Sequence, residues 1–107
     1  MAQHIKEEVE KKVKDFVNLL KPEITISSVY VFGSQAKGTA HEGSDIDIAI
    51  ISPDFGNDRM ENGVYLQRKL WDASYNYMDV VGYSPEYFEN ENSPLVHEIK
   101  KHGVLVS

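Results

Sequence analysis

The sequence contains no cysteine among its 107 residues, and this absence excludes several kinds of site. Disulfide frameworks, thiol catalysis and cysteine-ligated zinc centres all require that residue. No apolar run approaches the roughly 20 residues that a membrane-spanning helix needs. The first residues, MAQHIKEEVEKKV, also lack the apolar stretch of a secretory signal. We therefore expect a cytoplasmic protein that does not enter a membrane.

Positive charge is also scarce. The chain has 11 Lys and Arg against 17 Asp and Glu, which gives a formal net charge of −6 at pH 7. General nucleic-acid binders need cations to displace the counterions of the phosphates, so a nucleic-acid partner is not expected. The hydrophobic fraction of 41% and the charged fraction of 26% are ordinary globular values. The length fits one domain over 1–107.

Hydrophobic spacing and turn residues predict alternating helices and strands. In chain order these are a helix over 3–21, a strand over 24–32 or from near 28, a glycine-rich loop over 33–44 with an optional helical turn from Ser34, a strand over 45–51, a helix over 58–74, a strand over 77–83, a helix from Ser84, a helix over 94–102 and a short strand over 104–106. The order α-β-β-α-β-α-α-β predicts an α/β (α+β) fold, a small mixed β-sheet packed with helices.

Apolar spacing in the helix over 58–74 predicts which of its residues are buried. Met60, Val64, Leu70 and Trp71 are assigned to the buried stripe, and Leu66 to its edge. Trp71 is interpreted as a core and interface residue, with base stacking as the less favoured alternative.

The residues with the clearest chemistry lie at the ends of predicted strands. Gly33 and Ser34 follow the first strand, where a bare backbone and a hydroxyl suit the close approach of a phosphate. Asp45 and Asp47 are two positions apart on the next strand, so both carboxylates project from one face. Two carboxylates at that spacing can converge on one Mg²⁺ ion or bridge a pair.

A third carboxylate, Asp79, interrupts the apolar strand over 77–83. An aspartate there is costly unless it is paired, exposed or bound to metal. If the strands are neighbours, Asp79 joins the other two, and a divalent metal relieves the repulsion among the three. The alternatives are that Asp45 and Asp47 are solvated residues of an edge strand, and that Asp79 pairs with a Lys or Arg.

Gly33-Ser34, a gap of ten residues, Asp45-x-Asp47 and a later Asp79 resemble the hallmark of the nucleotidyltransferase superfamily that includes DNA polymerase β. The run FGSQAKGTAHEGSDIDIAI and the short length are most similar to the minimal nucleotidyltransferases, the MNT antitoxins of HEPN/MNT-type pairs. The resemblance implies that the three aspartates hold two Mg²⁺ ions and form the catalytic group.

The same resemblance implies a nucleotide site. Gly33 and Ser34 would hold the phosphates of ATP, and Lys37 occupies a position where the family often has a basic residue. Asp79 would also help to deprotonate the acceptor.

The implied function is Mg²⁺-dependent transfer of AMP from ATP to a hydroxyl acceptor, with a tyrosine of a HEPN-type toxin as the expected target. The chain is too short for the helical domain of larger relatives, so we expect a HEPN-type partner or a second copy (a homodimer) to complete the site. The alternative is a non-catalytic antitoxin of the same fold that neutralises its partner by occlusion. The intact motif favours the enzyme, because an occluding subunit has no chemical need for it.

Overall fold

The computed structural model describes residues 5–41, 43–56, 58–90 and 93–106. Its elements are α1 (Glu7–Leu20), β1 (Ser28–Phe32), α2 (Ser34–Lys37), β2 (Ile46–Ile51), α3 (Arg59–Asp72), β3 (Met78–Tyr83), α4 (Pro85–Asn90), α5 (Pro94–His102) and β4 (Val104–Leu105). The strands form one sheet in the order β3-β2-β1-β4. β1 pairs antiparallel with β2 and β4, whereas β2 and β3 are parallel, which confirms the predicted mixed sheet with helices.

Local signals in the sequence set most of the element ends. The helix predicted over 3–21 is α1, which ends at Leu20 just before Pro22; the predicted start at residue 3 lies outside the described residues. The strand predicted over 24–32 has the later of its two starts, and the optional helical turn from Ser34 is present as α2. Ser93 caps α5 by accepting a hydrogen bond from the Val96 amide.

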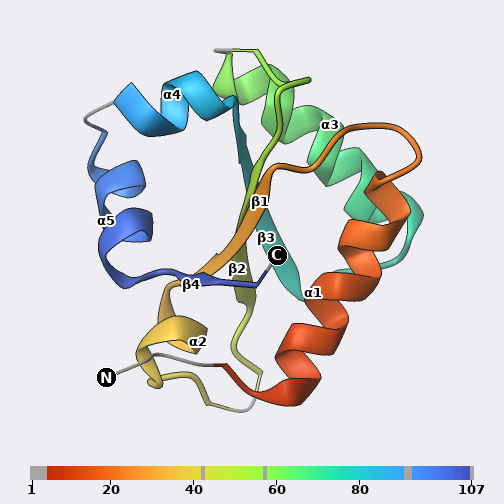
Figure 1. Ribbon diagram of the computed structural model, residues 1–107. Helices are drawn as coiled ribbons and strands as arrows, with labels where there is room; N and C mark the ends of the chain where they lie inside the picture. Colours follow the sequence, from red (N-terminus) through yellow and green to blue (C-terminus); the bar gives the residue numbers. More distant parts are fainter. Residues whose placement is uncertain (1–4, 42, 57, 91–92, 107) are drawn as a thin grey trace.

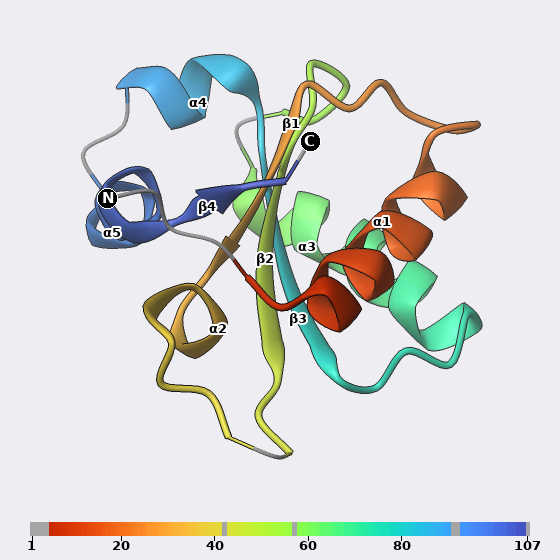
Figure 2. The ribbon, with the colours of Figure 1, turned by 60° about the horizontal axis from the view of Figure 1, so that its bottom comes forward.

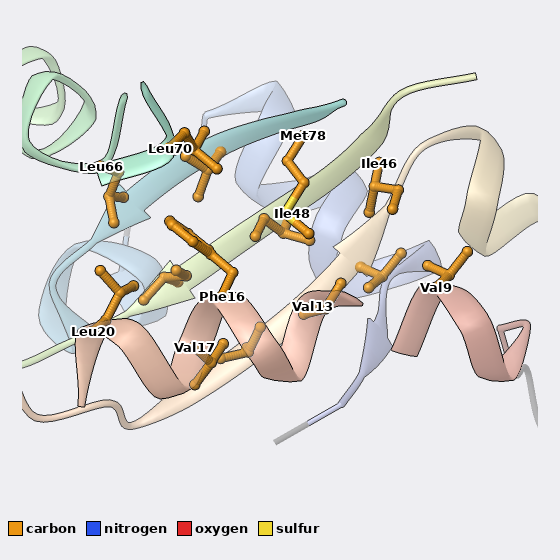
Figure 3. Packing of buried hydrophobic residues seen from close by; sticks show 14 of the residues in the cluster. Val9, Val13, Phe16, Val17, Leu20, Ile46, Ile48, Leu66, Leu70 and Met78 are labelled. Carbon is orange, nitrogen blue, oxygen red and sulfur yellow. The ribbon is translucent and has the colours of Figure 1, made fainter. Parts of the chain in front are cut away.

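The sheet separates two layers of helices (Figure 1). Figure 1 shows α1 and α3 on one side of the sheet and α4 and α5 on the other, and Figure 2 shows α2 near the end of β1. Because side chains alternate along a strand, Ile46 and Ile48 pack toward α1 (Figure 3), whereas Ala49 and Ile51 join the cluster against α4 and α5. The next residue on that second face of β2 is Asp47.

The buried stripe predicted for the helix over 58–74 is wrong at three positions. Met60, Val64 and Trp71 are 80%, 52% and 84% exposed, while Leu70 and the predicted edge residue Leu66 are buried.

A buried polar residue explains why α3 packs with a different face inward from the predicted one. The Asn62 amide is 6% exposed and donates to the carbonyls of Gly56 and Gly82. Those two bonds satisfy a polar group inside the protein, so α3 turns the face of Asn62 and Leu66 inward. No helix among the described residues is long and apolar enough to cross a bilayer.

Candidate active site

The three predicted aspartates lie near the starts of two parallel strands, β2 and β3, at one end of the sheet. The parallel register of β2 and β3 pairs Asp47 directly with Asp79, and Phe32 at the end of β1 pairs with Asp47 on its other side. Neighbouring strands lie about 4.8 Å apart, so Asp47 and Asp79 are adjacent on the same face. Asp45 lies one residue before β2, two positions from Asp47, and it is exposed.

Gly33 lies directly against the carboxylate of Asp47. Its backbone has φ 71° and ψ −147°, a region that is almost restricted to glycine. A Cβ atom at this position would collide with Asp47 Oδ2. Two requirements therefore favour glycine at this position. The backbone turn from β1 into α2 needs a positive φ, and the Asp47 carboxylate needs the space that a Cβ atom would fill.

Asp47 is the central carboxylate of the group. Partial burial is the main reason that its pKa is raised above the ordinary value of an aspartate, and the negative charges of Asp79 and Asp45 raise it further. The three side chains therefore interact electrostatically. A cation placed among them would be attracted by all three.

The loop before Asp45 is held by hydrogen bonds at both ends of a short turn. The Ser44 amide donates to the His41 carbonyl at 2.9 Å, and the His41 amide donates to Ser44 Oγ at 3.0 Å. The Ile46 amide then donates to the Tyr77 carbonyl at 2.9 Å. These bonds fix the backbone on both sides of Asp45 and join it to the segment that leads into Asp79.

The two other predicted site residues belong to α2. Ser34 is half-buried and is the first residue of α2. Lys37 is exposed and pairs with Glu98 of α5, with 2.9 Å between Nζ and Oε2. Hydrogen bonding to Lys37 lowers the pKa of the Glu98 carboxyl. No sequence pattern signals this pair, because it joins two helices that are distant in the chain.

The carboxylate group suits a divalent cation in charge, although its side chains are not gathered around one point. In the ranges that the structure describes, no three acidic or histidine side chains are close enough to form a metal-binding cluster. Asp47 and Asp79 are nevertheless paired across β2 and β3, and the bare backbone of Gly33 leaves space beside Asp47. Oxygen ligands of this kind suit Mg²⁺, which is bound through one or two carboxylates together with substrate phosphates and water.

Comparison with protein families identifies one match. The model for the nucleotidyltransferase domain covers residues 6–106, nearly the whole chain. No curated protein matches the sequence.

Several solved structures have the same fold. A chain of a toxin–antitoxin complex with AMP-PNP is 27% identical, with a TM-score of 0.63, over 92% of this chain and 72% of that one. A putative nucleotidyltransferase from Sulfolobus solfataricus is 20% identical, with a TM-score of 0.67, over 92% of this chain and 78% of that one. A chain from a complex of tri-AMPylated Shewanella oneidensis HEPN toxin with MNT antitoxin is 21% identical, with a TM-score of 0.58, over 94% of this chain and 71% of that one.

Proposed function

Because the chain belongs to the nucleotidyltransferase domain family, we propose that it transfers AMP from ATP to a hydroxyl group of a protein. The observation that carries this proposal is the group of three carboxylates at the end of the sheet where β2 and β3 begin. Asp47 and Asp79 are paired across parallel strands, Asp45 is two positions from Asp47, and the Gly33-Ser34 turn lies against Asp47.

Each residue has a distinct role in the proposed site. Asp45, Asp47 and Asp79 would hold two Mg²⁺ ions, which would supply Lewis-acid stabilisation when bound. The backbone of Gly33 and the hydroxyl of Ser34, which follow each other at the turn from β1 into α2, would bind the phosphates.

Lys37 belongs to the same helix as Ser34 and would add a positive charge for the phosphates. To do so, its ammonium group must leave Glu98.

The proposed reaction is an in-line substitution at the α-phosphorus of ATP. The acceptor oxygen forms a bond to that phosphorus, the bond to the oxygen bridging the α- and β-phosphates breaks, and pyrophosphate leaves. Asp79 accepts the proton of the acceptor hydroxyl. Its exposure at the edge of the sheet supports this role, because a group on a partner protein can reach it.

The expected acceptor is a tyrosine of a HEPN-type toxin, with this chain as its cytoplasmic antitoxin. Support comes from the similar structures, of which one holds AMP-PNP in a toxin–antitoxin complex and another pairs an AMPylated HEPN toxin with an MNT antitoxin. The net charge of −6 also favours a protein acceptor over a nucleic acid.

The test uses ATP labelled at two different phosphates, with a co-expressed HEPN-type protein as acceptor and Mg²⁺ present. Label on the α-phosphate should appear on the acceptor, whereas label on the γ-phosphate should leave as pyrophosphate. Asp47→Asn should lower the rate of transfer at least about a hundredfold, because it removes a charge from the metal site. Asp15→Asn is the matched control, since Asp15 is exposed on α1 and pairs with Lys11.

Other outcomes distinguish the alternative. If Asp47→Asn still neutralises the toxin and wild type transfers no label, the protein acts by occlusion. Transfer of the γ-label would mean phosphoryl transfer and would contradict the proposal.

A further inference from the structure

The outer face of α3 carries a stripe of large apolar side chains. Met60, Val64 and Trp71 are 80%, 52% and 84% exposed. At 100° per residue, their positions lie within about 40° of one another around the helix axis. Scattered apolar residues are normal on a surface, but three on one helical stripe form a contiguous strip.

A hollow lies beside each end of this stripe, between α3 and the edge strand β3. The hollow near Met60 measures about 330 Å³ and is lined by Met60, Gly63, Val81, Gly82 and Tyr83. The hollow near Trp71 measures about 520 Å³, and Leu70, Trp71, Tyr75 and Met78 contribute to its wall. Each end of α3 therefore has both a projecting apolar side chain and a recess.

Opposite charges border the stripe along one side. Glu61 and Arg68 are exposed and are separated by two helical turns on that side of α3. When a second copy of α3 runs in the opposite direction, the acidic residue of each copy faces the basic residue of the other.

We infer that this α3 face, defined by Met60, Glu61, Val64, Arg68 and Trp71, binds a second copy of the chain. A twofold axis that passes between the two α3 helices, perpendicular to both and near Val64, places Trp71 of each copy against the hollow beside Met60 of the other. Met60 and Trp71 are 11 positions apart, which is about 16 Å along the helix, so both insertions occur in one interface. Glu61 of each copy then lies within reach of Arg68 of the other.

This interface leaves the carboxylate group open. α3 packs on the face of the sheet that carries Ile48 and Val80, whereas Asp47 alternates to the opposite face. A dimer built through α3 presents two separate carboxylate sites to other proteins. The inference concerns the assembly of the chain and does not depend on the proposed chemistry.

Sedimentation and fluorescence of the purified full chain test the interface together. Trp71 is the only tryptophan, so its emission reports directly on the proposed contact. Wild type should sediment as a dimer, and its emission should shift to the red as dilution separates the copies. Trp71→Ala should raise the dissociation constant of the dimer about tenfold or more, as expected of a central aromatic anchor. Leu19→Ala is the matched control, because Leu19 is 47% exposed and belongs to a different helix, α1.

Reversing the charges of Glu61 and Arg68 tests whether the molecule that binds this face is a second copy of the chain. Glu61→Arg alone and Arg68→Glu alone should each weaken the dimer, whereas the double variant, or an equimolar mixture of the two single variants, should restore it. A monomer at every concentration would overturn the inference. So would a dimer unaffected by Trp71→Ala and by the charge reversals. If wild type is monomeric and these variants instead lose a HEPN-type partner, the face binds that partner and the second copy is excluded.

Discussion

Gly33 and Asp47 show how closely the backbone and a carboxylate are fitted at the sheet edge. The strand β1 ends one residue before Gly33, and β2 begins one residue before Asp47. The backbone of Gly33 packs against the side chain of Asp47, so a change at either residue should alter the other.

Replacement of Gly33 by alanine should destabilise the protein and displace the Asp47 carboxylate. Ala at φ 71° is strained, and its Cβ would overlap Asp47 Oδ2. Gly38→Ala is the control, because Gly38 has φ 75° with nothing within 4 Å of an added Cβ. Urea unfolding should place Gly33→Ala at least about 1 kcal/mol below Gly38→Ala.

A double-mutant cycle isolates the contact itself. Gly33→Ala should cost less stability in an Asp47→Ala background, since the carboxylate that it strikes is then absent. Equal costs in both backgrounds would show that Gly33 and Asp47 are independent.

Asp47→Asn should stabilise the metal-free protein at pH 7 by a few degrees in Tm. Burial and the charges of Asp79 and Asp45 raise the pKa of Asp47 in the folded state, so ionised Asp47 favours unfolding. The stability that this group contributes is complete below its unfolded-state pKa and is lost as pH rises through the folded-state pKa. The advantage of the variant should therefore shrink as pH falls to about 4.

Thermal melts from pH 4 to 8 measure this difference, with Asp15→Asn as the control for the general effect of acid. A constant gap between wild type and Asp47→Asn across that range would be inconsistent with a raised pKa.

At the scale of elements, the sequence predicted most strands and helices because their signals are local. Ser93-Pro94 at the start of α5 and Pro22 after α1 act within a few residues of the ends that they mark. The pairing of β2 with β3 was conditional in the sequence, and the parallel register that joins Asp47 to Asp79 confirms it.

The orientation of α3 was not predictable in the same way. Its sequence has apolar residues on two sides, and the side that is buried depends on carbonyls from segments outside the helix. Asn62 finds two of these, at Gly56 and Gly82, so the side of Met60 and Trp71 faces outward. Periodicity alone cannot distinguish a stripe that packs on the sheet from one that packs on another molecule.

The pairing of α2 with α5 leads to a prediction about ATP. Glu98 holds the Lys37 ammonium group and so keeps its positive charge from the phosphates. Glu98→Gln should lower the KM for ATP about twofold, in keeping with the small strength of an exposed pair, and leave kcat and Tm unchanged. Steady-state kinetics at low salt would show this effect, which should fade at high salt.

Lys37→Ala provides the matched comparison, because it should raise the KM for ATP. The double variant should then behave like Lys37→Ala. If Glu98→Gln lowers the KM to the same extent without Lys37, the pair is not the cause.

At the scale of the whole molecule, the sheet separates the carboxylate edge from the outer face of α3. Each of the two layers of helices covers one face of the sheet (Figure 2). Asp47 and Asp79 are paired near the starts of β2 and β3, on the face that carries Ala49 and Ile51. The three aspartates also account for half of the net charge of −6, so the rest of the surface is only mildly acidic. A bound cation would neutralise the part of the charge that is most concentrated.

Calorimetric titration with Mn²⁺, as a stand-in for Mg²⁺, tests the central claim that these carboxylates form a metal site. Wild type and Asp15→Asn should bind the ion alike at pH 7, and both should bind it more weakly at pH 5, because the raised pKa of Asp47 lets that carboxylate take up a proton. Asp47→Asn should weaken binding at least about tenfold. Equal binding by wild type and Asp47→Asn would contradict the account, because the central carboxylate would then have no part in holding the metal.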